Sequence, residues 1–426
     1  MVGVTETATL TDDRARQLLA WLGAGLLAGG MPTHEVEEDV RQAARSLGSA
    51  RAQVAALPRG IHVALAPGGP ATFEQVEGSV RLDQLADVSA VLAGLRAGRL
   101  PAEEALDRLG ALRARPHRYA VPGLLAGGVL SGVGIALVLA PAGPSVAFAA
   151  LLAPLTVALM LLGGHRTVAT LTPFLAAFGV ALAAFAAAAA GWVDAPLWTL
   201  VAPIAVILPG ATIVTGLVEL AAGSMVAGTS RLAHGTVQLL LFALGVGAAV
   251  ALLRTPVGLL DPERPVELDW WAPLLGVVVV TVAISLMESV SVSLVPWLLV
   301  TAVATYLAQL VGNTTAEGRW AGAFLGALVA ILVASLVEFV RPELPRSVVF
   351  LPSFWLLVPG SFGLVTVAQL EVGPGAAFAS FVGVTLVVAA IALGVVLGAS
   401  LASPLRGAAR RMGLVHLLRR VRRRRD

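Results

Sequence analysis

The spacing of hydrophobic positions divides the chain into two parts near residue 119. Before that point, apolar residues recur with helical spacing over 10–29, 33–48, 83–97 and 101–114. Short runs bounded by turn residues predict strands over 52–57, 61–66, 71–76 and 79–82. Residues 1–118 therefore predict a small α+β domain.

After residue 119 the apolar residues are nearly continuous. Segments of roughly 17–25 apolar residues are long enough to cross a hydrocarbon core as helices. Ten such spans are predicted, over 119–140, 145–163, 168–190, 197–218, 233–253, 270–287, 290–311, 320–340, 347–368 and 375–401. The predicted fold class is a polytopic α-helical membrane protein with ten transmembrane helices, preceded by the α+β domain.

The first apolar run, L-L-A-W-L-G-A-G-L-L-A-G-G at 18–30, has the length of a signal-peptide core. It lacks a basic segment before it, because Asp12 and Asp13 precede Arg14 and Arg16. It also continues into a charged helical pattern. We interpret it as the first helix of a cytosolic domain.

Composition agrees with this division. Of the 426 residues, 57% are hydrophobic and only 13% are charged, whereas soluble domains carry about 25% charged residues. About half of the charged residues lie in the first 118 positions. The chain has no cysteine, which excludes disulfides, thiolate catalysis and cysteine-bound metals.

The placement of arginine predicts the topology. With residues 1–118 in the cytoplasm, the inward loops carry Arg166, Arg231, Arg341 and Arg346, and the tail at 405–426 is rich in arginine. The turn at Glu288 is the one inward loop without arginine. This pattern satisfies the positive-inside rule with both termini in the cytoplasm. All 29 basic residues are arginine, which together with abundant Ala, Gly, Leu and Val indicates a GC-rich bacterial genome. We interpret the arginine-rich tail as a membrane-anchoring flank and not as a nucleic-acid arm.

A helix-breaking pair occurs twice in the apolar region. Pro209-Gly210 interrupts the run V-I-L-P-G-A-T-I-V-T-G-L-V-E-L at 206–220, and Pro359-Gly360 lies 150 residues later. The same shift lays the first five predicted spans almost on the second five. A five-span unit crosses the membrane an odd number of times, so its second copy starts from the opposite side. The sequence thus predicts two inverted five-helix repeats, over 119–254 and 255–404.

The broken helices are the predicted substrate site. Lipid cannot satisfy freed backbone groups, so they must face protein or a water-lined cavity. Free amides can bind a carboxylate and free carbonyls can bind an ammonium group or a coupling cation. An alternative interpretation is a simple kink that serves helix packing. The predicted substrate-binding residues are Pro209, Gly210, Thr212, Thr215, Pro359, Gly360 and Ser361.

Ionisable residues are few within the apolar region. An intramembrane charge costs roughly 2.5–3.5 kcal/mol at a helix centre, which makes such residues functional candidates. Glu219, Arg231, Glu288 and His165 are the candidates for proton coupling or gating, although the last three lie near predicted cytoplasmic ends, where they can be solvated. Burial of Glu219 would favour proton coupling, whereas pairing with Arg231 would make the two residues a gate or a structural clamp. The sequence does not choose between these.

Other chemistry finds no support in the sequence. The chain contains no H-E-x-x-H, G-x-x-x-x-G-K-[ST] or G-x-S-x-G motif, and its six histidines show no metal-ligand spacing. No enzyme activity, cofactor or metal is therefore predicted. Glycines four residues apart, at 123/127, 128/132 and 322/326, indicate tight helix packing and also allow a homo-oligomer.

The segment at 208–232 resembles the threonine/serine exporter family. Members of that family show a proline-glycine pair, an acidic-Leu pair, a Gly-rich turn and an Arg-Leu pair. The matching residues are Pro209, Gly210, Glu219, Leu220, Gly228, Arg231 and Leu232. The family more often has aspartate at the position of Glu219.

Two further segments are similar to the same family. The helix at 31–48 matches at Val36-Glu37 and Leu47-Gly48, although Glu35 stands where a basic residue is usual. The second half resembles the family's smaller membrane domain, including F-L-P-S-F-W-L-L-V-P-G at 350–360.

The resemblance implies a ten-helix secondary transporter that exports threonine, serine or a related small solute, driven by protons. Its partners would be the amino acid, protons and membrane lipid, and not nucleic acid. Two alternatives stay open. One is an uncoupled channel or facilitator with the same fold, and the other is a membrane-anchored scaffold or sensor.

Overall fold

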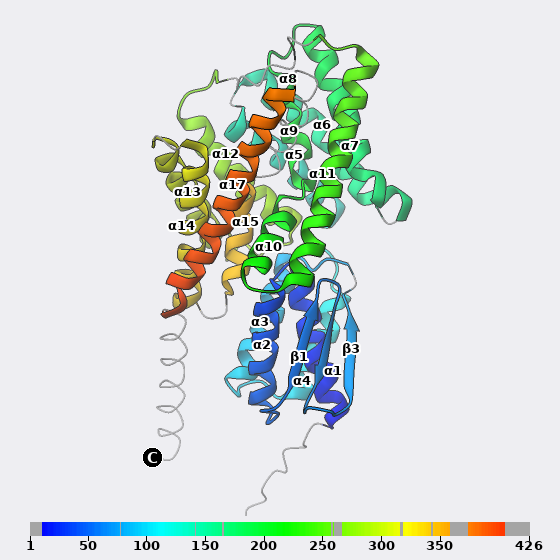
Figure 1. Ribbon diagram of the computed structural model, residues 1–426, viewed down its shortest axis with the longest axis vertical. Helices are drawn as coiled ribbons and strands as arrows, with labels where there is room; N and C mark the ends of the chain where they lie inside the picture. Colours follow the sequence, from blue (N-terminus) through cyan, green and yellow to red (C-terminus); the bar gives the residue numbers. More distant parts are fainter. Residues whose placement is uncertain are drawn as a thin grey trace, which may run out of the picture.

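The computed structural model describes residues 11–76, 78–140, 142–163, 166–256, 259, 266–315, 318–341, 344–357 and 374–404. Figure 1 shows a mixed α/β part at one end of a longer helical bundle. We call residues 11–113 the N-terminal region and residues 120–404 the helical region. Four residues of the predicted sites, His165, Pro359, Gly360 and Ser361, lie outside the described residues.

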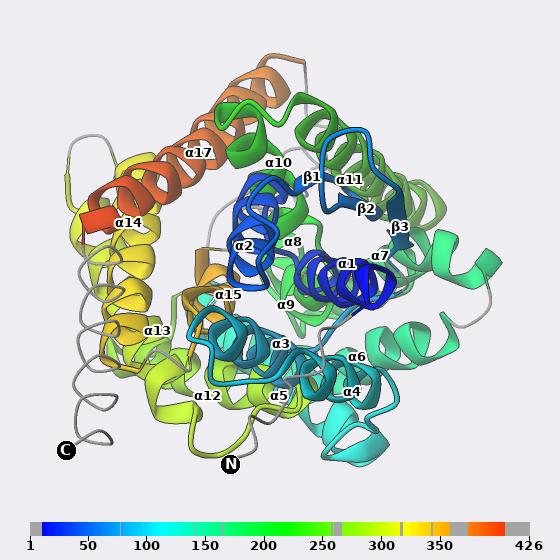
Figure 2. The ribbon, with the colours of Figure 1, turned by 90° about the horizontal axis from the view of Figure 1, so that it is seen from below.

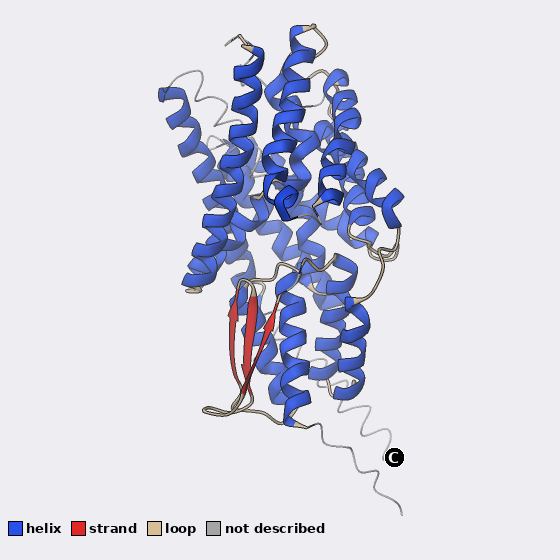
Figure 3. Ribbon diagram, turned by 90° about the vertical axis from the view of Figure 1, so that its right-hand side faces the viewer, coloured by secondary structure: helices blue, strands red, loops and turns tan. Residues whose placement is uncertain are grey.

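The N-terminal region contains four helices and three strands. In chain order they are α1 (Asp12–Ala28), α2 (Thr33–Ser46), β1 (Gln53–Leu57), β2 (Gly60–Ala64), β3 (Ala71–Gln75), α3 (Leu82–Arg96) and α4 (Ala102–Arg113). The strands form one antiparallel sheet in the order β1-β2-β3, drawn in red in Figure 3.

Helix α1 forms the centre of this region. It contacts the sheet, α2, α3 and α4, and the view in Figure 2 places it between the sheet and the α3–α4 pair. Leu18, Leu22 and Leu26 are fully buried because they are four residues apart and so lie on one face of the helix, which packs against these elements. The first apolar run is thus the core helix of the N-terminal region.

The strand predicted over 79–82 is wrong. Those residues form no strand in the structure, and Leu82 is already the first residue of α3. The amide of Val80 donates to the carbonyl of Ala28 at 3.1 Å, which ties the segment to the end of α1 and not to β3. A run of four residues that also begins a helix is too short to extend the sheet.

The helical region contains long apolar helices and a few short helical segments. In chain order they are α5 (Ala120–Leu139), α6 (Gly143–Leu162), α7 (Arg166–Ala189), α8 (Pro196–Thr199), α9 (Val201–Ile204), η1 (Ala205–Ile207), α10 (Gly210–Ala221), α11 (Met225–Leu253), α12 (Trp271–Met287), α13 (Val295–Asn313), α14 (Gly318–Val340), α15 (Arg346–Leu357) and α17 (Pro374–Leu401).

Among the described residues, seven helices are long and apolar enough to cross a membrane, or eight if the bent pair Pro196–Ile207 and Gly210–Ala221 is one span. Trp271–Met287 and Arg346–Leu357 are shorter apolar helices. The chain is therefore a multi-pass membrane protein. The count of ten spans stays a prediction.

Glycines allow the helices of the bundle to approach closely. A methyl group built on Gly132 would lie 3.0 Å from the carbonyl oxygen of Ala149 on α6, and one on Gly322 would lie 2.7 Å from that of Gln309 on α13. Such short separations leave no room for a side chain. The tight packing predicted for these glycine spacings is confirmed at both positions.

Candidate functional site at the junction of the two regions

The helix preceding α10 breaks where the sequence places Pro209-Gly210. The segments on either side meet at 66°. Leu208 is extended, with φ −66° and ψ 136°, because the ring of a following proline disfavours helical backbone at the residue before it. Helix α10 then begins at Gly210, and the amides of its first turn have no preceding helical carbonyls to accept from them.

The threonines predicted to bind substrate follow this break. Thr212 and Thr215 lie in the first two turns of α10 and are half-buried. Helix α10 packs against α11 and α17, and its residues Val214 and Val218 share an apolar cluster with Phe354 of α15. We call residues 120–254 the first half of the helical region and residues 255–404 its second half. The break thus lies where these two halves meet.

Glu219 and Arg231 form an ion pair. The Nε atom of Arg231 lies 3.0 Å from Oε2 of Glu219, without the alignment of a hydrogen bond. The Glu219 side chain is completely buried and the Arg231 side chain is 15% exposed. Of the two interpretations of Glu219 from the sequence, the structure thus places it in the pair.

The other oxygen of Glu219 reaches the N-terminal region. The backbone amide of Thr33 donates to Oε1 of Glu219 at 2.9 Å. Thr33 is the first residue of α2, whose preceding residue, Pro32, provides no side-chain cap. A carboxylate at this position satisfies a free amide and interacts favourably with the helix dipole. Glu219 therefore joins α10 and α11 to α2.

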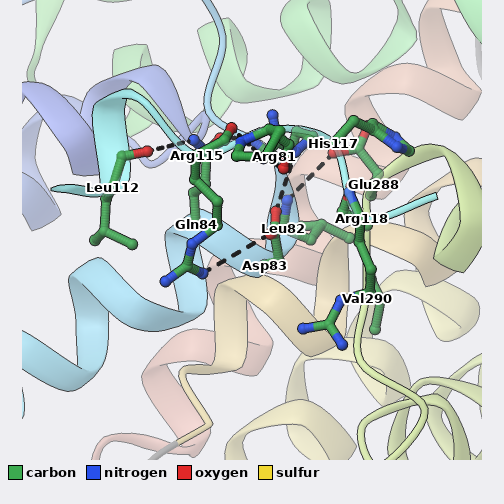
Figure 4. Close-up of polar contacts among 12 residues, drawn as sticks. Arg81, Leu82, Asp83, Gln84, Leu112, Arg115, His117, Arg118, Glu288 and Val290 are labelled. Carbon is green, nitrogen blue, oxygen red and sulfur yellow. Dashed lines mark hydrogen bonds and ion pairs between the residues drawn. The ribbon is translucent and has the colours of Figure 1, made fainter. Parts of the chain in front are cut away.

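Glu288 makes the equivalent contact with α3. It follows the end of α12, and its Oε2 accepts from the amide of Leu82 at 3.2 Å, as Figure 4 shows. The amide of Asp83 donates to the Glu288 backbone carbonyl at 3.4 Å. Burial raises the pKa of the Glu288 carboxyl above its ordinary value of 4.5, and the nearby Asp83 charge adds to this, while Leu82 and Arg81 oppose it.

The linker between the two regions is held on the same loop. The Nε2 atom of His117 lies 2.9 Å from the carbonyl oxygen of Met287. The amide of Arg118 donates to Oγ of Ser289 at 3.2 Å, and the Tyr119 hydroxyl donates to the carbonyl of Val290 at 2.8 Å. Residues 117–119 therefore run along the loop that follows α12.

A third charged contact crosses the junction. The Arg346 guanidinium at the start of α15 donates to the Glu35 carboxylate on α2. The Arg346 side chain is 10% exposed and that of Glu35 is 24% exposed. Glu35 is the residue that departs from the usual basic one of the resembled family, and here it pairs with an arginine.

The structure brings some of the predicted site residues together and separates others. Glu219 and Arg231 are in contact, whereas Glu288 binds a different helix of the N-terminal region. Thr33, Leu82 and the Glu35–Arg346 pair were not predicted. The one sequence signal for these contacts was a charge at the predicted cytoplasmic end of a span, because Arg346 stands in an inward loop. No group of three or more His, Asp or Glu residues that could hold a metal ion occurs in the part of the chain that the structure describes.

Comparison with known proteins identifies the family. No curated protein and no solved structure matches the chain. Residues 17–253 match a family described as "Putative threonine/serine exporter". The match covers more than half of the chain, from within α1 to the last residue of α11, and includes Thr33, Glu35, Pro209, Glu219 and Arg231. It does not extend to the second half, whose resemblance to the same family stays a prediction. The chain belongs to the threonine/serine exporter family.

Proposed function

We propose that the protein is a secondary transporter that exports threonine, serine or a related small solute, driven by protons. The observation that carries this proposal is the break at Pro209-Gly210, which lies inside the segment that matches the family. Broken helices near the centre of a membrane are a common way for transporters to bind a substrate with charged groups.

Inverted repeats would give this transporter two opposed halves. The shift of 150 residues takes the segment 196–207 onto 346–357, the bounds of α15. It also takes the bounds of α5, α6, α7 and α11 to within two residues of those of α12, α13, α14 and α17. Helices of similar length in the same order support a duplicated unit.

The packing of α5 on α12 supports opposite orientations of the two units. A methyl group on Gly127 would lie 2.9 Å from the carbonyl oxygen of Ala283, and one on Gly134 would lie 3.0 Å from that of Gly276. As residue numbers rise along α5, the contacted residues on α12 fall, so the two helices are antiparallel. Corresponding helices of inverted repeats must run in opposite directions.

Corresponding glycines also occupy corresponding contacts. Gly245 of α11 packs against Phe174 and Ala177 of α7, and Gly394 of α17 packs against Phe324 and Ala327 of α14. The contacted residues differ by 150 in both cases, and the two glycines differ by 149. This agreement is closer than a shared pattern of hydropathy would require.

The substrate would lie at the start of α10. Amides of its first turn suit the carboxylate of an amino acid, and the hydroxyl groups of Thr212 and Thr215 suit a substrate hydroxyl. Pro359, Gly360 and Ser361 are proposed to complete the site from the second unit. Glu219, Arg231, Glu288 and His165 are proposed for proton coupling or gating.

The N-terminal region would face the cytoplasm of a bacterial cell. Its contacts with the helical region involve Glu219, Glu288 and Arg346, all at the ends of spans that arginine placement predicts to be cytoplasmic. The C-terminal tail would lie on the same side. Both termini are therefore proposed to lie on the cytoplasmic side of the inner membrane.

The test is efflux from cells loaded with a threonine-containing peptide, with and without an uncoupler. We expect expressing cells to export threonine faster than cells with an empty vector, and the uncoupler to remove the difference. Equal export by both kinds of cell would exclude threonine as a substrate. Export that the uncoupler leaves unchanged would favour an uncoupled facilitator.

A variant of the break tests where the substrate binds. Pro209→Ala with Gly210→Ala should favour a continuous helix and abolish export without reducing the amount of protein in the membrane. Pro154→Ala is the matched control, because Pro154 lies inside α6 away from the break. Normal export by the double variant would contradict the proposed site.

Deletion of residues 1–110 tests the alternative of a membrane-anchored scaffold or sensor. If the shortened protein still exports threonine, that alternative is excluded.

A further inference from the structure

One turn of helix α2 contacts both halves of the helical region. The Thr33 amide binds Glu219 of α10, in the first half. The Glu35 carboxylate, two residues further on, binds Arg346 of α15, in the second half. We call residues 33–35 the bridging turn. Because these residues belong to one rigid helix, they fix the distance between the two binding groups.

The groups that the bridging turn binds are buried. Glu219 is completely buried, and only 10% of the Arg346 side chain is exposed. Glu219 is also paired with Arg231 of α11 within the first half, at 3.0 Å, and the charge of Glu338 on α14 acts on Arg346 within the second half. The bridging turn thus joins two buried side chains, one from each half.

Among the described residues, further hydrogen bonds hold the N-terminal region against the second half. The amide of Leu82 binds Glu288, and the linker residues His117, Arg118 and Tyr119 bind the loop that follows α12. These contacts attach α3 and the linker to one half. The bridging turn is then the part of the N-terminal region that reaches across to Glu219.

Alternating access requires the cytoplasmic ends of the two halves to separate while the site is open to the cytoplasm. A bridging turn bound to both halves opposes that separation. If the N-terminal region stays with the second half, separation breaks the bond between Thr33 and Glu219. If it stays with the first half, separation breaks the Glu35–Arg346 pair.

We propose that the bridging turn is the inner gate of the transporter. The gate is closed in the structure, and one of its two contacts opens in each cycle to admit substrate from the cytoplasm. The inference rests on the proposed transport function. It adds that the N-terminal region takes part in the transport cycle directly, through Thr33 and Glu35.

A reversible cross-link tests the gate. The chain has no cysteine, so Glu35→Cys with Arg346→Cys introduces a single pair across one contact of the gate, and Thr33→Cys with Glu219→Cys introduces a single pair across the other. We expect a short bifunctional methanethiosulfonate to stop threonine export by the variant whose contact opens in the cycle, and dithiothreitol to restore it. The control is Arg14→Cys with Glu103→Cys, an exposed ion pair between α1 and α4 within the N-terminal region, whose cross-link should leave export unchanged.

The outcomes are distinct. Undiminished export by both cross-linked gate variants would overturn the proposal. If the reduced Thr33→Cys/Glu219→Cys form exports nothing, its contact is judged by labelling. A block by the control cross-link as well would also overturn it, because the effect would then belong to the N-terminal region in general. Absence of threonine export from every form, reduced or cross-linked, would instead contradict the proposed function, and the gate would then be judged by labelling.

Labelling needs no known substrate. Thr212→Cys places one thiol after the break in α10, and a maleimide added to inside-out vesicles reaches it from the cytoplasmic side. Adding Glu35→Arg sets two arginines against each other, so we expect several-fold faster labelling. Restoring opposite charges with Arg346→Glu should return the labelling rate to its original value. Equal rates in all three forms would contradict a gate at this turn, and a fast rate that the exchange of charges does not reverse would indicate general loosening and also contradict it.

Discussion

Glu219 holds three helices together through one carboxylate. It pairs with Arg231 of α11 and accepts from the first amide of α2, while its own backbone belongs to α10. Glu219→Ala would leave a buried guanidinium and a buried amide without their partner. Breaking a buried ion pair in this way costs about 3–5 kcal/mol.

We therefore expect Glu219→Ala to lower the stability of the purified protein by about that amount, measured by thermal unfolding in detergent. Glu219→Gln should lose less, because its amide oxygen can still accept from Thr33. Glu104→Ala is the control. Glu104 is about half exposed in a pair with Arg108, and such surface pairs contribute at most about 1 kcal/mol. Equal unfolding of the Glu219→Ala and Glu104→Ala variants would contradict this role of Glu219.

The Glu288 carboxyl should make stability depend on pH. The groups around it are Arg81 and Asp83 of the N-terminal region. His117 and Arg118 of the linker contact Met287 and Ser289, the residues on either side of it. Because burial raises its pKa from 4.5, the folded protein retains this proton at a pH where the unfolded chain has released it. Stability from this group is therefore present at low pH and is lost as pH rises through the raised pKa.

Unfolding measured at a series of pH values above 4.5 checks this sign. The wild-type protein should lose stability with rising pH over that window, and Glu288→Gln, which has no proton to release, should show a smaller slope. Glu103→Gln, in an exposed pair with Arg14, controls for the removal of a carboxylate. A slope in Glu288→Gln equal to that of wild type would show that other groups carry the pH dependence.

Two helix pairs depend on a glycine at the point of closest approach. A methyl group on Gly245 would lie 2.6 Å from the carbonyl oxygen of Phe174, and one on Gly394 would lie 2.6 Å from that of Phe324. Backbone atoms cannot move aside as a flexible side chain can. Gly245→Ala and Gly394→Ala should therefore force α11 from α7 and α17 from α14, at a cost of about 1–3 kcal/mol each.

Gly247 provides the matched control on the same helix. Nothing lies within 4 Å of a methyl group built there, and alanine favours helix more than glycine does. Gly247→Ala should leave thermal unfolding unchanged or raise its midpoint slightly. Similar losses in the Gly245 and Gly394 variants would also support the repeat, and a loss in only one of them would weaken it.

The elements could be predicted from the sequence to a greater extent than the contacts between them. The bounds of α2, α3 and α4 and the break before α10 follow from local signals, namely Pro32, Pro101 and Pro209 and the helical spacing of apolar residues. The strand at 79–82 failed because four residues carry too weak a pattern. The partners of Glu219, Glu288 and Arg346 lie 186, 206 and 311 residues away, and no local pattern specifies pairs so distant.

The predicted site itself could be read only in part. The sequence marked Glu219 and Arg231 as candidates but left pairing and proton coupling open, because both outcomes use the same two residues. Thr33 and Leu82 gave no signal, since they bind through backbone amides, which every residue except proline has. The role of Glu35 could likewise not be predicted, because its partner Arg346 is 311 residues away.

At the scale of the whole molecule, the two ends of the helical region differ in chemistry. The N-terminal region covers one end. Tryptophans gather at loops and helix starts that the chain direction assigns to the other end: Trp192, Trp270, Trp271 and Trp320, which are 75%, 79%, 43% and 41% exposed. Tryptophan is enriched where a membrane meets water. One end therefore carries a folded region and the other an aromatic rim.

This polarity predicts which residues each side of the membrane can reach. Helix α12 ends against the linker at Met287, so its start, and Asp269 before it, lie at the opposite end. Asp194 precedes α8, which Figure 1 places at that end too.

Single cysteines at Asp194 and Asp269 should react with an impermeant maleimide in intact cells, because both residues are exposed. Cysteines at Arg51 and Ser293, also exposed, should react only after permeabilisation, because the cytoplasmic side holds the N-terminal region and the loop after α12. Labelling of Ser293→Cys in intact cells would reverse the proposed orientation, and with it the direction in which the inner gate faces.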